Sequence, residues 1–66
     1  MSNKVTVNFF SREQNQLTQV LINFRGHSHG LAEVVSEEEV EKLSDIEGSI
    51  LKAIRAIDQY NAYANK

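Results

Sequence analysis

The sequence predicts a single small α+β domain spanning residues 1–66, with an antiparallel sheet of two or three strands followed by one long C-terminal helix. Residues 4–10 and 17–25 contain apolar residues that alternate with polar ones, which is the period of a half-buried strand. In residues 36–64 the apolar residues instead recur every three or four positions, which is the period of a helix with one apolar side. A β-α-β-α order is the alternative.

The first predicted strand covers residues 4–10. Val5, Val7 and Phe9 would face one side of the sheet, and the polar residues between them the other. The polar residues 11–16 predict a connection to the next element.

Residues 17–25 fit two structures. As a strand, they would turn Val20, Ile22 and Phe24 to the core, and their β-branched residues favour this interpretation. As a helix, they would begin with a Ser11/Gln14 capping box and end at Gly26. Residues 26–30 (GHSHG) then predict a tight connection with a glycine at each end. Residues 31–35 predict a short third strand or the approach to the helix.

The helix over residues 36–64 has a clear start. Ser36 and Glu39 form a capping box, and Val35 and Val40 fit the hydrophobic staple. Ser44 and Gly48 allow a kink or break in its middle, although the apolar stripe keeps step through them. A continuous helix of this length measures about 42 Å. It would overhang a small sheet, so we expect a homodimer formed through this helix.

Composition limits the function classes. The chain has 66 residues, no cysteine and a net charge of −2, which excludes disulfides and thiolate metal sites. Its longest apolar runs are too short to cross a membrane, and we expect a small acidic cytoplasmic protein without a cofactor.

The charge is unevenly spread. Residues 33–47 hold seven carboxylates against one lysine, a net charge of −6. An acidic helix start of this kind can dock on a basic partner, and tyrosines are favoured interface anchors. The predicted partner-binding residues are Glu37, Glu38, Glu41, Asp45, Tyr60 and Tyr63.

A nucleic-acid site is the alternative. Its candidate contacts to phosphates and bases are Arg25, His27 and His29, with Lys4 and Arg12. The acidic neighbouring segment works against it.

Neither a catalytic nor a metal site is predicted. GHSHG matches the G-x-S-x-G nucleophile elbow, but the chain is too short for the sheet that holds one, and no histidine follows His29. His27 and His29 lack the further ligands that zinc requires.

The leading hypothesis is therefore a non-enzymatic interaction module that binds and modulates or inhibits another protein. In size and charge asymmetry the chain is similar to small accessory or inhibitor proteins encoded by phages, which is an analogy only.

Overall fold

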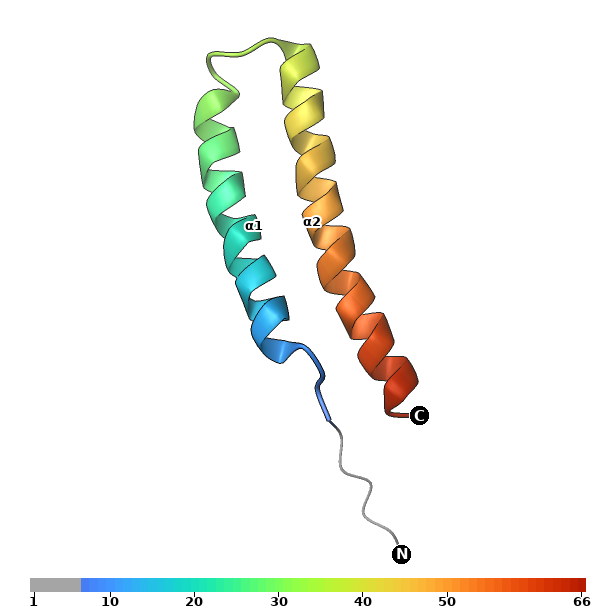
Figure 1. Ribbon diagram of the computed structural model, residues 1–66. Helices are drawn as coiled ribbons and strands as arrows, with labels where there is room; N and C mark the ends of the chain where they lie inside the picture. Colours follow the sequence, from blue (N-terminus) through green and yellow to red (C-terminus); the bar gives the residue numbers. More distant parts are fainter. Residues whose placement is uncertain (1–6) are drawn as a thin grey trace, which may run out of the picture.

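The structure, a computed structural model, describes residues 7–66 and contains two antiparallel helices joined as a hairpin (Figure 1). Helix α1 covers Ser11–Leu31 and helix α2 covers Glu37–Ala64. Residues 32–36 connect them at one end of the molecule. Residues 7–10, here called the strap, lie beside the last turns of α2 at the other end.

The predicted C-terminal helix is present as α2, which runs for 28 residues without a break. Ser36 is its N-cap, and the Ser36 side chain accepts a hydrogen bond of 3.3 Å from the backbone N–H of Glu39. Three glutamates occupy the first turn, where unpaired N–H groups favour negative charge. Gly48 lies within the continuous helix, so the break that Ser44 and Gly48 allowed as an alternative does not occur.

The predicted sheet is wrong, and so is the β-α-β-α alternative, because residues 7–66 contain no strand. Residues 17–25, predicted as a strand, form the middle of α1. Residues 26–30, predicted as a tight connection, continue the same helix, and none of their glycines has a positive φ. Residues 31–35 close α1 and form the connection instead of a third strand. Of the strand predicted over residues 4–10, positions 4–6 lie outside the described residues, and residues 7–10 form a strap without strand pairing.

Helix α1 forms because its apolar residues also satisfy the helical period. The positions that face α2 are spaced alternately three and four residues apart, and α2 repeats this spacing, as in the seam of a coiled coil. On α1 these positions are Gln14, Leu17, Leu21, Phe24 and Ser28, and on α2 they are Val40, Leu43, Glu47, Ile50, Ile54, Ile57 and Asn61.

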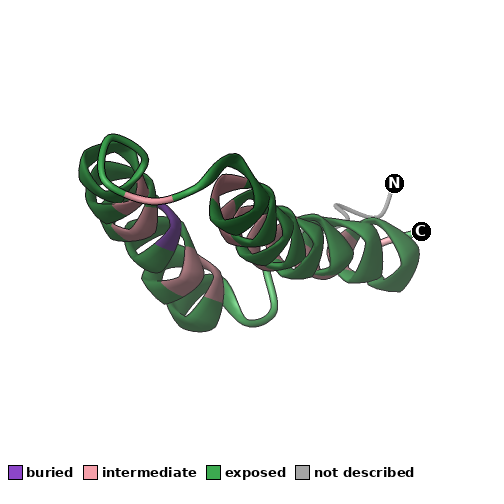
Figure 2. Cartoon of the chain, turned by 90° about the horizontal axis from the view of Figure 1, so that it is seen from above, coloured by how far each residue is buried: buried purple, intermediate pink, exposed green. Residues whose placement is uncertain are grey.

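The seam between the helices buries little surface. Leu21 is 5% exposed and is the one buried residue among residues 7–66. Ile50, Ile54 and Ile57, which belong to the apolar stripe of residues 36–64, are half-buried. Half-buried residues gather along the facing sides of the helices (Figure 2), and the molecule measures 60 × 17 × 13 Å. Neither described helix is long and apolar enough to cross a membrane.

Truncation of Leu21 should weaken the hairpin most. We expect Leu21→Ala to lower the free energy of unfolding by about 2–5 kcal/mol, the usual range for a buried leucine. Its neighbour Ile22 is 56% exposed, so Ile22→Ala is the control and should cost well under half as much. Circular-dichroism melts compare the two, and equal losses would contradict the orientation of α1.

The glycines provide a test of helix continuity. Gly26, Gly30 and Gly48 lie within helices, and a Cβ added at any of them meets no atom within 4 Å. Each Gly→Ala change should therefore stabilise the protein, by about 0.5–1 kcal/mol. Had residues 26–30 been a turn with positive φ, Ala at Gly26 or Gly30 would destabilise it. Urea titration at each position distinguishes these outcomes.

Candidate functional site

The predicted partner-binding residues lie in two separate regions of α2. Glu37, Glu38, Glu41 and Asp45 are exposed on the first turns, beside the connection. Tyr60 and Tyr63 lie near the other end of the helix and are 48% and 74% exposed. Fifteen residues separate Asp45 from Tyr60, which is about 22 Å along the helix axis. The six side chains therefore form an acidic end and a tyrosine end instead of one surface.

The candidate nucleic-acid contacts are also spread apart. Arg25 Nε lies 3.4 Å from Glu47 Oε2, which leaves this guanidinium paired with a carboxylate. His27 and His29 are exposed two residues apart on α1, a spacing that turns them about 200° apart around a helix. Arg12 lies in the first turn of α1, and Lys4 lies outside the described residues.

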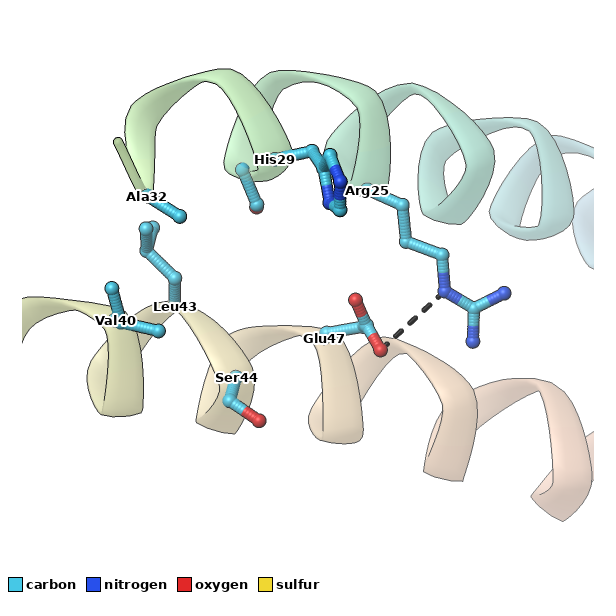
Figure 3. Close-up of a pocket in the computed structure, with 8 residues that line it drawn as sticks. Arg25, His29, Ala32, Val40, Leu43, Ser44 and Glu47 are labelled. Atoms are coloured by element: carbon cyan, nitrogen blue, oxygen red, sulfur yellow. Dashed lines mark ion pairs between the residues drawn. The ribbon is translucent and has the colours of Figure 1, made fainter. Parts of the chain in front are cut away.

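A hollow of about 320 Å³ lies between the helices near the connection (Figure 3). The Arg25–Glu47 pair closes one side of it, and Ala32, Val40 and Leu43 form its apolar wall. Ser28 and His29 also line it, and the buried Ser28 hydroxyl has no hydrogen-bond partner among residues 7–66. A nucleophile needs a base within hydrogen-bond reach, and no hydrogen bond within residues 7–66 joins Ser28 to His29. The same residues include no group of three or more potential metal ligands that could hold an ion.

The most specific polar geometry of the hairpin is at its other end, where Asn61 and Asn65 hold the strap. The Asn61 carboxamide accepts from the N–H of Phe9 at 2.6 Å and donates to the Phe9 carbonyl at 3.1 Å. The Asn65 carboxamide accepts from the N–H of Val7 at 2.9 Å and donates to the Val7 carbonyl at 2.7 Å. Each side chain thus pairs with both backbone groups of one strap residue. We call Asn61 and Asn65 the clamp.

Aromatic contacts accompany the clamp. The Tyr60 ring meets those of Phe9 and Phe10 edge to face, with centroids 5.9 and 5.8 Å apart. Phe10 is the N-cap of α1, has a left-handed backbone (φ 61°) and makes no side-chain cap hydrogen bond. A left-handed non-glycine residue is strained by about 1–2 kcal/mol, so the contacts of the strap offset strain at this hinge.

Gln14 fixes the start of α1 against α2 beside the strap. Its side-chain amide donates to the backbone carbonyl of Ile54 at 3.2 Å and to Asp58 Oδ1 at 2.7 Å. Neither Gln14 nor the clamp was predicted from the sequence. Asparagines four residues apart at the end of an apolar helical stripe are the signal that was available.

Substitution of Asn61 by Asp should detach Phe9. The carboxylate keeps the acceptor but loses the donor and faces the Phe9 carbonyl, so we expect a loss of about 1–3 kcal/mol in unfolding free energy. Asn23 is exposed and accepts a hydrogen bond from Gln19, which an Asp can also accept. Asn23→Asp is therefore a control of equal charge.

Low pH should restore the stability that Asn61→Asp loses. The charged form of the new carboxyl is the unfavourable one, so its pKa is raised in the folded chain, and the loss disappears as pH falls below that pKa. Thermal melts at neutral pH and near pH 3 measure this, and two variants that behave alike at both would contradict the Asn61–Phe9 pairing.

Comparison of the chain with protein-family models, with curated proteins and with solved structures found no match.

Proposed function

We propose that this chain is a non-enzymatic protein-interaction module that works as a homodimer, with two hairpins packed as a four-helix bundle and an acidic end free to bind and modulate a basic partner protein. The observation that carries the proposal is the lack of burial: one buried residue supports two helices, while ten large apolar side chains in residues 7–66 are exposed. The cytoplasmic location remains a prediction.

The exposed surface supports association. The chain exposes 5607 Å², whereas a compact monomer of 7.5 kDa exposes about 4,250 Å². The excess is about 1,350 Å². One partner's share of a standard interface is about 800 Å², which is about three fifths of this excess. The radius of gyration of 16.4 Å likewise exceeds the value of about 11 Å expected for this length.

A second apolar stripe on α2 provides the surface for the second copy. It flanks the seam, repeats the spacing of three and four residues, and is exposed along its whole length. Its members are Ile46, Ser49, Ala53, Ala56, Tyr60 and Tyr63. Val20 comes one residue before the seam position Leu21 of α1, and Ile46 comes one residue before the seam position Glu47 of α2. In an antiparallel helix pair, residues at such positions flank the seam on the same side, so Val20 extends the stripe onto α1.

A second copy is the occupant that fits this stripe best. A two-fold axis buries the same stripe on both copies at once, and two hairpins placed face to face give a four-helix bundle. The small residues Ala53 and Ala56 allow close approach of two helices in the middle of the stripe. The original reason for expecting a dimer, a helix that overhangs a sheet, is replaced by this one.

The acidic end is the surface that remains for a different protein. Glu37, Glu38, Glu41 and Asp45 are exposed, and none of them takes part in the ion pair of the hairpin. Their shared charge suits a basic protein surface and repels nucleic acid. Tyr60 and Tyr63 belong to the dimer interface in this proposal, which divides the predicted partner-binding set between two tasks.

Substitution within the stripe tests the dimer. Ala56 is exposed in the single hairpin, where Glu would be harmless because it is a good helix former. In the dimer, Ala56→Glu buries a charge on each copy at the axis, so we expect a monomer at tens of micromolar and a lower melting temperature. Sedimentation equilibrium gives the mass.

Gln59→Glu is the matched control, since it adds the same charge to an exposed position one turn further along α2. It should leave the dimer intact. The interface would be rejected if the wild type and both variants all sediment as monomers, or if all three sediment as dimers.

A further inference from the structure

We propose that Asn61 and Asn65 form a binding site for an extended peptide, and that residues 7–9 are its built-in ligand. This goes beyond the dimer and its acidic end, because Asn61 and Asn65 belong to neither. Tyr60 lies at the border and is the one side chain that the stripe and the peptide site share.

The clamp forms hydrogen bonds with backbone groups of the strap and not with its side chains. All four of its hydrogen bonds to the strap go to the N–H and carbonyl groups of Val7 and Phe9. In extended backbone, the N–H and carbonyl of one residue point to the same side, and those of the residue two further on point there again. Asn8 lies between the two and contributes neither group to these bonds. Any extended peptide without proline at the two paired positions presents the same pattern.

The spacing of the clamp explains why extended backbone fits it. Residues four apart on a helix are separated by about 6.0 Å along the axis, and residues two apart on a strand by about 6.6 Å. Asn61 and Asn65 are four apart and take residues two apart. Phe9 pairs with the earlier asparagine and Val7 with the later one, so the bound segment runs antiparallel to α2.

Asn65 is fixed in place by a further hydrogen bond to α2. The Asn65 side-chain amide also donates to the Asn61 backbone carbonyl at 2.8 Å, so its two hydrogens point to α2 and to the ligand. Both asparagines are half-buried. Tyr60 adds preference at one position: an aromatic side chain on the ligand residue paired with Asn61 gains the edge-to-face contact that Phe9 makes.

The strap, as the built-in ligand, can be released from the clamp. Val7, Phe9 and Phe10 are 45%, 40% and 55% exposed, so the strap shields little apolar surface. Its connection to α1 passes through the left-handed Phe10, and a strained hinge favours release. A peptide supplied from outside makes the same bonds without that hinge. The ligand class is thus an extended segment with an aromatic residue at the Asn61-paired position.

The experiment frees the site in the full-length chain. Val7→Pro together with Phe9→Pro removes both N–H donors of the strap and leaves Phe10 and α1 unchanged. Asn8→Pro is the matched control, because its N–H is not among the clamp bonds and a proline favours extended backbone in the residue before it. The probe is a dye-labelled acetylated peptide with the sequence KVTVNFF of residues 4–10.

Fluorescence anisotropy should show saturable binding to the double-proline variant. Binding to wild type and to Asn8→Pro should be at least about tenfold weaker, because the strap occupies the site for most of the time. Addition of Asn61→Leu and Asn65→Leu to the double-proline variant should abolish binding. Methylation of the peptide nitrogen of its Val7 equivalent should also abolish binding, whereas methylation at its Asn8 equivalent should not.

Backbone amide resonances of the strap in the wild type provide a second measurement that needs no substitution. The N–H signals of Val7 and Phe9 should move when the peptide is added in excess, because the released strap loses its bonds to the clamp. Failure of the double-proline variant to bind while it keeps its helical circular dichroism would overturn the proposal, and so would binding that survives loss of both asparagines. Neither result touches the dimer, which the sedimentation of Ala56→Glu decides.

Discussion

The line of contact between α1 and α2 is the constraint on which the rest of this structure depends. Two helices side by side can shield one stripe on each, and domains ordinarily bury their apolar faces by packing layers on one another. Here the second layer is missing from the single chain, which explains why Leu21 is buried while Ile50, Ile54 and Ile57 remain half-buried. The thin outline of the molecule and its exposed flank of alanines and tyrosines follow from the same geometry.

Polar contacts near both ends of the seam fix how the helices are aligned. Gln14 meets Asp58 at the strap end, and Arg25 meets Glu47 nearer the connection. Eleven residues separate the two contacts on each helix, which is close to three turns. Apolar packing alone tolerates a slide of one helix along the other, but a shift by one turn would separate both polar pairs. The ion pair is half-exposed, so its effect is on register more than on stability.

Sequence reasoning predicted α2 correctly because several local signals agree there: the Ser36 cap, the first-turn glutamates and a stripe that keeps one period for 28 residues. It failed on α1 because residues 17–25 satisfy both the strand and the helical period, and their β-branched residues tipped the choice. Gly26 and Gly30 then supported a turn that does not exist, since glycine also tolerates helical backbone when packing against a neighbour holds it. The acidic residues and tyrosines stay predicted partner-binding residues, and the structure separates them into two ends of α2. The spacing of Asn61 and Asn65 is visible in the sequence, but their ligand is not, because the clamp binds backbone groups of residues more than fifty positions away.

The geometry of the clamp limits the number of ligand residues that it can bind. Four residues along an α-helix turn 40° past a full revolution, so successive asparagines with this spacing drift steadily around the helix while an extended chain continues nearly straight. A second asparagine four residues along the helix can still reach the ligand with its carboxamide. A third would point well away from the ligand and would lie about 1.2 Å short of the next paired ligand residue along the axis. A single straight helix can therefore recognise two alternating backbone positions and little more. Such a site is suited to rapid exchange of its occupant, and any longer-lived complex must obtain its lifetime from another surface.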